Sequence, residues 1–320
     1  MVETRLLRID GGAVPLGIRE KRPTAGATGH PPVLLAHGAT LGGALFDLPR
    51  SGYSLMEALS RGGRAVYAVD VRGYGLSSGA AVMGGPAEAH PPFARAEEVV
   101  PDIAAAVRFI LERCAVPALD LVGFSWGTIT AACHAIARPG TVRRLALYAP
   151  LFAERNPLWL QRIADPADPQ RLAPGLGAHR LVTAASLIER WNSDLPSGDP
   201  LRFREAGIAE LAFDTIAALD PLALQRSPPA FRCPNGALAD MVRVFNGQPL
   251  YDAAALTAPL LVVRGEHDTT STDSDAASLL ARSGSSVKEY RVVGRASHFL
   301  CIERAREGLY EALDRFLAPS

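Results

Sequence analysis

The sequence carries no excess of charge of either sign, because 33 Lys and Arg residues balance 33 Asp and Glu residues over 320 positions. A zero net charge gives no electrostatic basis for binding nucleic acid or an anionic membrane surface. We therefore expect neither nucleic acid nor a membrane as a partner.

Cysteine is also scarce, with Cys114, Cys133, Cys233 and Cys301 as the only four. No two of them form a C-x-x-C pair or follow the spacing of a metal site, so we expect buried free thiols and no metal. Residues 1–12 lack the apolar core of a secretion signal, and no run approaches the roughly 20 apolar residues of a membrane span. These absences predict a cytoplasmic location.

Short apolar runs alternate with segments of helical periodicity over most of the chain. An antiparallel hairpin is expected first, and the later strands are expected to be parallel and buried, because helices connect them. The expected strands are residues 4–9, 14–20, 33–36, 65–71, 119–123, 145–148, 260–264 and 287–293. The expected helices are residues 54–60, 97–113, 128–137, 274–281 and 302–316.

The interval 151–250 interrupts this alternation and is rich in proline. Helical patches at residues 181–191 and 203–219 indicate that it is a structured insertion, because an irregular loop of such length is improbable. We expect a core made of residues 1–150 and 251–320, with residues 151–250 forming a helical cap.

The strongest chemical signal is the run Gly-Phe-Ser-Trp-Gly at residues 123–127, placed between an expected strand and an expected helix. A sharp turn at this point forces the middle residue into a strained backbone conformation, and the two glycines relieve the crowding around it. The turn presents the hydroxyl of Ser125 above the sheet, near the N–H groups that begin the next helix. Ser125 is therefore the candidate nucleophile.

A serine needs a neighbouring base, and His298 is the best placed of the seven histidines. It follows the last expected strand and precedes the last helix. His37, by contrast, ends an early strand and is expected to shape the loop beside the site.

The base needs an acid that orients it, and Asp268 lies four residues after the expected strand 260–264. Asp273 and Asp275 follow closely, but they fall at the start of an expected helix and are expected to cap it. Glu266 lies nearer the strand and is expected to be structural.

The reaction also needs donors for a developing oxyanion. We expect the backbone N–H groups of Trp126 and Ala39 in this role, since one follows the nucleophile and the other lies in the loop after an early strand. The expected substrate-binding residues are Thr40, Trp159, His179 and Trp191. Arg155 and Arg190 are alternatives for pairing with a substrate carboxylate, but a solvated or ion-paired role is favoured for both.

In their order and spacing, these motifs resemble the α/β-hydrolase superfamily. The matching runs are HGA at 37–39, DVRGYGLS at 70–77, GFSWG at 123–127, GEHD at 265–268 and SH at 297–298. The resemblance implies an eight-stranded core with a lid, the triad Ser125, Asp268 and His298, and no metal or organic cofactor. Epoxide hydrolases and haloalkane dehalogenases share the layout but carry Asp as the nucleophile, so Ser125 argues against them. The proline-iminopeptidase branch usually has His-Gly-Gly-Pro-Gly where this chain has His-Gly-Ala-Thr.

The leading hypothesis is a serine hydrolase that cleaves a carboxylic ester, lactone or activated amide of a small, mostly apolar molecule through an acyl-enzyme. A thioesterase or a C–C bond hydrolase with the same triad remains open. A ligand-binding or receptor-like protein, or a cofactor-free lyase using His298 alone, are the alternatives of another class. The sequence offers no motif that identifies the substrate.

Overall fold

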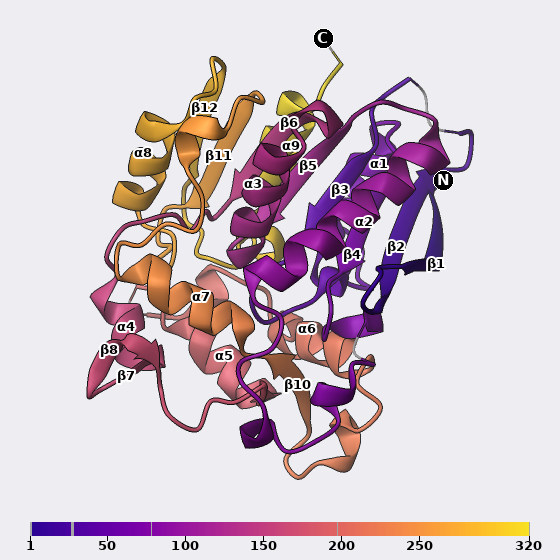
Figure 1. Ribbon diagram of the computed structural model, residues 1–320. Coiled ribbons are helices and arrows are strands. Elements are labelled where there is room, and N and C mark those ends of the chain that lie inside the picture. Colours follow the sequence, from indigo (N-terminus) through magenta and orange to yellow (C-terminus); the bar gives the residue numbers. More distant parts are fainter. Residues whose placement is uncertain (1, 27–28, 78, 197, 320) are drawn as a thin grey trace.

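One large sheet forms the centre of the computed structural model, which describes residues 2–26, 29–77, 79–196 and 198–319 (Figure 1). The strand order is β1-β2-β4-β3-β5-β6-β11-β12, and only β1 and β2 run antiparallel to their neighbours. The eight strands are β1 Val2–Asp10, β2 Pro15–Pro23, β3 Val33–Ala36, β4 Val66–Asp70, β5 Leu119–Phe124, β6 Val142–Tyr148, β11 Leu260–Gly265 and β12 Lys288–Val293. This mostly parallel, eight-stranded sheet confirms the predicted fold class.

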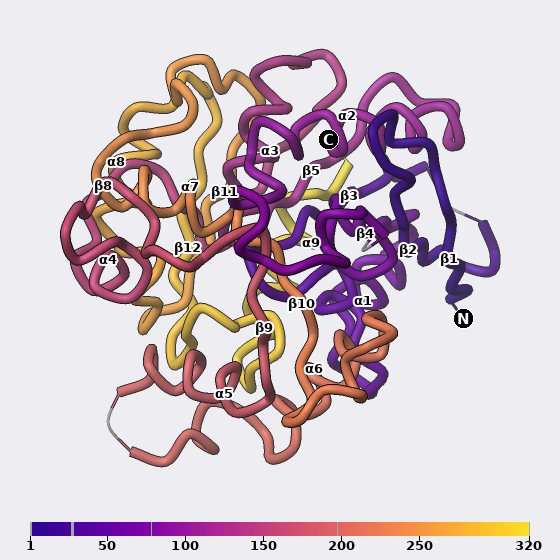
Figure 2. The backbone as a smooth tube through the Cα atoms, turned by 60° about the horizontal axis from the view of Figure 1, so that its bottom comes forward, coloured from indigo at the N-terminus to yellow at the C-terminus, as the bar shows by residue number. Residues whose placement is uncertain are grey.

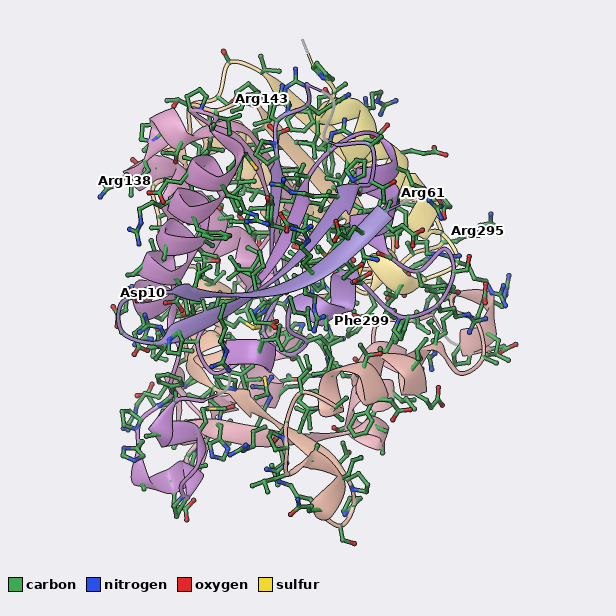
Figure 3. All side chains as sticks on the ribbon, turned by 90° about the vertical axis from the view of Figure 1, so that its right-hand side faces the viewer. Asp10, Arg61, Arg138, Arg143, Arg295 and Phe299 are labelled. Atoms are coloured by element: carbon green, nitrogen blue, oxygen red, sulfur yellow. The ribbon has the colours of Figure 1, made fainter. Side chains whose placement is uncertain are left out.

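Helices cover both faces of the sheet, which explains why the central strands are apolar at nearly every position. Helix α2 packs against α3 and α1 against α9, and Figure 3 shows the sheet between α2 and α3 on one side and α9 on the other. The helices around the sheet are α1 Leu55–Arg61, α2 Ala96–Cys114, α3 Trp126–Ala137, α8 Asp273–Arg282 and α9 Arg306–Phe316. Helix α9 begins four residues later than predicted, because residues 300–302 form a separate 3₁₀ turn.

Residues 151–250 lie at one end of the large sheet and contribute no described strand to it (Figure 1). The segment was expected to be helical, but it also contains two small antiparallel sheets, β7–β8 and β9–β10. Its elements are α4 Pro157–Ile163, β7 Ala164–Asp165, β8 Asp168–Leu172, β9 His179–Thr183, α5 Ala184–Asn192, α6 Ile208–Ala217, β10 Ala230–Pro234 and α7 Gly236–Phe245.

The predicted helical patch 181–191 is therefore part strand and part helix. Residues of β9 pair in register with those of β10, about fifty positions further along the chain, and Figure 2 shows the two strands side by side. Because this pairing is non-local, the periodicity of the patch itself carries no sign of it.

Several features are reported only for the described part of the chain. No helix there has the length and apolarity needed to cross a bilayer. Cys114, Cys133, Cys233 and Cys301 are free, the first two half-buried and the last two buried.

Candidate active site

Ser125 lies at the sharp turn between β5 and α3. Its backbone angles are φ 54° and ψ −124°, in a region that L-residues rarely adopt. The flanking glycines permit the turn: a Cβ on Gly123 would lie 2.6 Å from the carbonyl oxygen of Gly127, and one on Gly127 would lie 2.4 Å from those of Ala36 and His37. The local sequence thus folds as its motif predicts.

Three side chains far apart in the sequence meet at this turn. Nε2 of His298 lies 2.9 Å from Oγ of Ser125, and Nδ1 of His298 lies 2.9 and 3.0 Å from the two carboxylate oxygens of Asp268. All three side chains are buried. The structure therefore brings together the three residues that the sequence singled out, in the relay that acyl transfer by serine requires.

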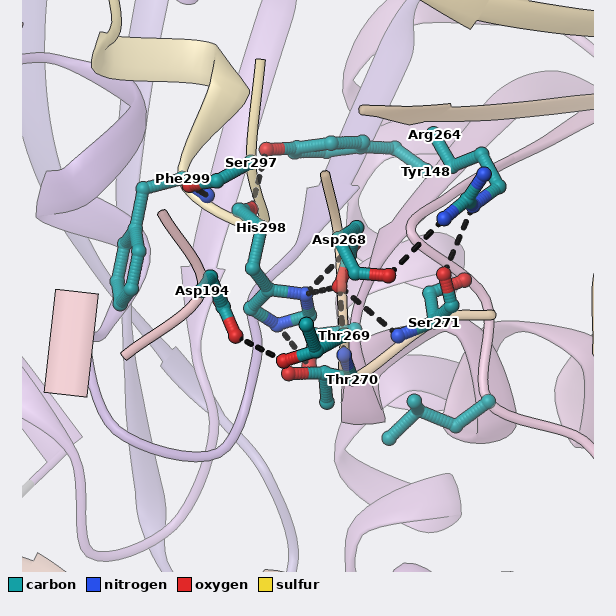
Figure 4. Close-up of polar contacts among 12 residues, drawn as sticks. Tyr148, Asp194, Arg264, Asp268, Thr269, Thr270, Ser271, Ser297, His298 and Phe299 are labelled. Atoms are coloured by element: carbon teal, nitrogen blue, oxygen red, sulfur yellow. Dashed lines mark hydrogen bonds and ion pairs between the residues drawn. The ribbon is translucent and has the colours of Figure 1, made fainter. Parts of the chain in front are cut away.

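The carboxylate of Asp268 is held by the loop that follows it (Figure 4). Its Oδ1 accepts hydrogen bonds of 2.9 Å from the backbone N–H groups of Thr270 and Ser271. Arg264 donates to the carbonyl oxygens of Asp268 and Ser271, at 2.9 and 2.8 Å. Burial alone would raise the pKa of Asp268, but His298 and the two N–H groups outweigh burial and leave this pKa below its usual value. Asp268 thus remains charged and can orient His298.

A buried carboxylate, Glu303, holds the loop that carries His298. It accepts hydrogen bonds from the backbone N–H of Ser297 at 2.7 Å, from the Ser297 hydroxyl at 2.5 Å, and from Nε1 of Trp191 at 2.7 Å. Tyr148 donates to the carbonyl oxygen of His298 at 2.7 Å, the contact drawn in Figure 4. The histidine is therefore fixed through its own backbone and through the residue before it.

His37 fixes the loop that carries Ala39. The backbone N–H of Val71 donates to Nε2 of His37 at 3.2 Å, and Nδ1 lies 2.8 Å from the carbonyl oxygen of Gly38, which can only accept. Burial lowers the pKa of His37, so the ring is neutral and Nδ1 carries the proton. Because a trans peptide points its C=O and N–H in opposite directions, the N–H of Ala39 faces away from His37.

Trp126, the residue after the nucleophile, is anchored by its side chain. Its Nε1 donates to Asp240 of α7 at 3.0 Å, and the same carboxylate accepts from the backbone N–H of Ala96 and from Nε of Arg95. The indole is buried. Its anchor therefore comes from the segment 151–250 and not from the large sheet.

A cavity of about 350 Å³ opens over Ser125. Its wall is mostly apolar, with Ser125 and His298 at its floor and Gly38 and Ala39 beside them. The apolar lining residues are Leu41, Phe124, Trp159, Ile163, Leu176, Leu181, Val182, Leu187, Leu238, Met241 and Phe299. Ser125 and His298 thus face a cavity that can hold a small molecule, and residues of the segment 151–250 form part of its wall.

The predicted substrate-binding residues divide into two groups. Thr40 and Trp159 line the cavity. His179 and Trp191 are not among the described lining residues: Nε2 of His179 lies 3.2 Å from the carbonyl oxygen of Gly85, and Trp191 is fully buried against Glu303. Trp191 therefore contacts Glu303, which holds the His298 loop, and is not among the residues described as lining the cavity.

Sequence reasoning missed three residues that the structure places at the site, namely Arg180, Asp240 and Glu303. Nη2 of Arg180 donates to the carbonyl oxygen of Ala39 at 3.2 Å and to Oγ1 of Thr40 at 3.0 Å. All three residues lie outside the recognisable motifs, and their partners at the site include residues of other elements. No local spacing in the sequence points to any of them.

A mostly parallel sheet with a serine, a histidine and an aspartate at the ends of β5, β12 and β11 defines the class of the α/β hydrolases. The comparisons with known proteins agree: the family model described as "alpha/beta hydrolase fold" matches residues 31–305. The chain therefore belongs to the α/β-hydrolase family and is a hydrolase of that fold. No curated relative matches the sequence.

Solved structures with the same fold span nearly the whole chain. A serine hydrolase from Cycloclasticus zankles is 18% identical, with 98% of each chain covered and a TM-score of 0.66. The 2-hydroxy-6-oxo-6-phenylhexa-2,4-dienoate hydrolase from Rhodococcus sp. strain RHA1 is 19% identical, with 99% of this chain and 100% of that chain covered and a TM-score of 0.67. A thioesterase domain from the curacin biosynthetic pathway is 17% identical, with 98% and 99% covered and a TM-score of 0.60. At these identities, the likeness establishes the fold alone.

Proposed function

We propose that this protein is a serine hydrolase that cleaves a carboxylic ester, lactone or activated amide of a small, mostly apolar molecule. The observation that carries the proposal is the continuous hydrogen-bond relay from Ser125 through His298 to Asp268, on the floor of a cavity. The same relay activates serine on several unrelated folds.

In the proposed mechanism, Ser125 attacks the carbonyl carbon while His298 takes the proton from its hydroxyl through Nε2. Asp268 stabilises the imidazolium that forms. The N–H groups of Ala39 and Trp126 donate to the oxyanion, and His298 then returns the proton to the leaving group. His298 then takes a proton from water, which attacks the acyl-enzyme. As the bond between the acyl carbon and Oγ breaks, His298 returns this proton to Ser125 and the acid is released.

These residues supply the nucleophile, the base and the oxyanion donors, so we propose that the reaction uses no metal or organic cofactor. We also propose residues 151–250 as a cap over a core of residues 1–150 and 251–320. In this arrangement, a small molecule is the partner, neither nucleic acid nor a membrane is bound, and the enzyme acts in the cytoplasm. The balanced charge supports the absence of nucleic-acid and membrane binding, and the four free thiols support a cytoplasmic location.

A thioesterase or a C–C bond hydrolase is the second candidate. Its support is the whole-chain likeness to a dienoate hydrolase and to a thioesterase domain, both of which share the fold. Initial rates on matched oxygen-ester, thioester and dienoate substrates separate the three activities, because each predicts a different order of kcat/KM.

The central test is the intact mass of the protein after treatment with a fluorophosphonate. Wild type is expected to gain one phosphonyl group, and Ser125→Ala none, because only a serine activated by a neighbouring base reacts. Ser271→Ala is a matched control, since Ser271 is buried nearby but contacts Asp268 only through its backbone N–H. Equal labelling of wild type and Ser125→Ala would contradict the proposal.

A further inference from the structure

The wall of the cavity carries charge of only one sign. Arg162, Arg180 and Arg190 are among its described lining residues, and no Asp or Glu is. The whole chain has a net charge of zero, so this imbalance is local to the cavity. Cations in a cleft with apolar walls concentrate anions, because the low dielectric of the walls focuses the field.

Two of the arginines converge beside Trp159. Nη1 of Arg162 and Nη1 of Arg190 donate to the same hydroxyl, that of Ser193, at 3.2 and 3.3 Å. Both guanidinium groups also lie against the ring of Trp159, at 5.6 and 4.6 Å from its centroid. Holding two like charges together is unfavourable unless an anion lies between or beside them.

Among the described residues, Asp194 is the one acidic partner of this pair. Nη1 of Arg190 lies 2.8 Å from Oδ2 of Asp194, whereas Arg162 has no acidic partner in the described chain. Arg162 uses one of the five N–H donors of its guanidinium, in the bond to Ser193. A charge and several donors therefore remain at this end of the cavity.

Arg190 lies on the side of the cavity where His298 and the loop of Asp268 lie. Nη2 of Arg190 donates to Oγ1 of Thr270, in the loop that holds Asp268, and its guanidinium lies 5.6 Å from the ring of Phe299, the neighbour of His298. Arg180 lies on the opposite side, against Ala39 and Thr40, and its four hydrogen bonds to described residues all go to neutral oxygens. Because His298 must protonate the leaving group, a carboxylate on that part of the substrate would lie near Arg190, and Arg162 lies beside Arg190 at Trp159.

We propose that the substrate carries a carboxylate, and that this carboxylate pairs with Arg162 and Arg190 while the reacting carbonyl lies at Ser125. The inference rests on the proposed function for the position of the carbonyl, but not for the binding of the anion. A planar guanidinium binds a carboxylate through two parallel hydrogen bonds, and the apolar wall accommodates the rest of the molecule.

Binding to the Ser125→Ala protein tests the anion site without any turnover, so that failure of the catalytic proposal does not affect the result. The probes are 4-phenylbutyrate and its neutral amide, 4-phenylbutyramide, measured by calorimetry at pH 7 and low salt. The acid is expected to bind roughly tenfold more tightly than the amide, as for a charge-assisted hydrogen bond. Adding Arg162→Gln should reduce that preference several-fold, and adding Arg190→Gln should abolish it.

Arg162→Gln is the safer of the two variants, because Arg162 is exposed and its loss leaves no buried acid unpaired. Arg138→Gln in the same background is the matched control: it also removes one exposed positive charge, but far from the cavity (Figure 3). It should leave the preference unchanged. Equal affinity for acid and amide, a preference that survives Arg162→Gln, or no binding of either probe would each overturn the proposal.

Discussion

At the scale of single residues, the hydrogen bonds of the Asp268 carboxylate determine which nitrogen of His298 carries the proton. Its carboxylate accepts from two backbone N–H groups and faces Nδ1 of His298, and no other donor among the described residues bonds to it. This arrangement forces the proton of His298 onto Nδ1 and leaves Nε2 free to accept from Ser125.

Replacing Asp268 with asparagine should reverse that tautomer. The amide N–H₂ would donate to Nδ1, the proton would move to Nε2, and kcat should fall by about 10³- to 10⁴-fold. Steady-state kinetics on an activated ester measures the loss, and circular dichroism checks that the fold is retained. Asp273→Asn is the control, since Asp273 also follows β11 but binds Arg264 and Tyr290 instead. A loss of less than tenfold in Asp268→Asn would refute the assigned role.

Ser125, Asp268 and His298 could be predicted because each lies within a few residues of a strand end, where local pattern is informative. Glu303 and Asp240 could not. Their importance depends on Trp191 and Trp126, each more than 100 positions away in the chain, and nothing in the local sequence marks such a pair.

Among the elements, the turn from β5 to α3 requires glycine on both sides of Ser125. A Cβ added to Gly127 would lie 2.4 Å from the carbonyl oxygens of Ala36 and His37. These are backbone atoms, which cannot move aside as a flexible side chain can. The helix therefore sits against the sheet at a distance that only glycine allows.

We expect Gly127→Ala to lower the free energy of unfolding by about 3 kcal/mol or more, because the added methyl overpacks a rigid site. Chemical denaturation gives the value. Gly140→Ala is the matched control beyond the other end of α3, where a Cβ would meet no atom within 4 Å and φ is not positive. It should change stability by less than about 0.5 kcal/mol. Similar values for the two variants would mean that the close approach is not limiting.

The start of α8 shows why element boundaries were easier to predict than side-chain partners. The helix lies within one residue of its predicted bounds, but Thr272 and not an aspartate caps it. Asp275, expected as a cap, accepts instead from the backbone N–H groups of Phe152, Ala153 and Glu154, where the segment 151–250 begins. That partner could not be predicted without knowing which strands are neighbours.

At the scale of the whole molecule, Glu303 joins the catalytic loop to residues 151–250 through Trp191. Burial raises the pKa of Glu303 to about 7, because its three hydrogen bonds do not offset the loss of water. The folded protein therefore holds a proton on Glu303 at pH values where the unfolded chain, with an ordinary pKa near 4.5, has lost it.

This difference in pKa between the folded and unfolded states determines whether the free energy of unfolding rises or falls with pH. Since the folded state binds the extra proton, the contribution of Glu303 to the free energy of unfolding is largest below pH 4.5 and declines as pH rises toward 7. The decline should be at most about 1.4 kcal/mol per pH unit, and it should be missing in Glu303→Gln. Denaturation at pH 5, 6 and 7 for both proteins measures it. Parallel curves for the two proteins would show that Glu303 does not titrate in this window.

The bond from Arg180 to the carbonyl oxygen of Ala39 links the segment 151–250 to the loop after β3, and this link matters when the segment is exchanged. A residue of the segment 151–250, Arg180, contacts the loop that supplies a proposed oxyanion donor, so changes in this segment are expected to alter that loop as well as the cavity wall. Replacing residues 151–250 with the corresponding segment of a relative would change the cavity wall and remove Arg180. The hydroxyl of Tyr74, which lies outside that segment, would still donate to the carbonyl oxygen of Ala39 at 3.0 Å, so such a chimera would keep one of the donors that hold this loop.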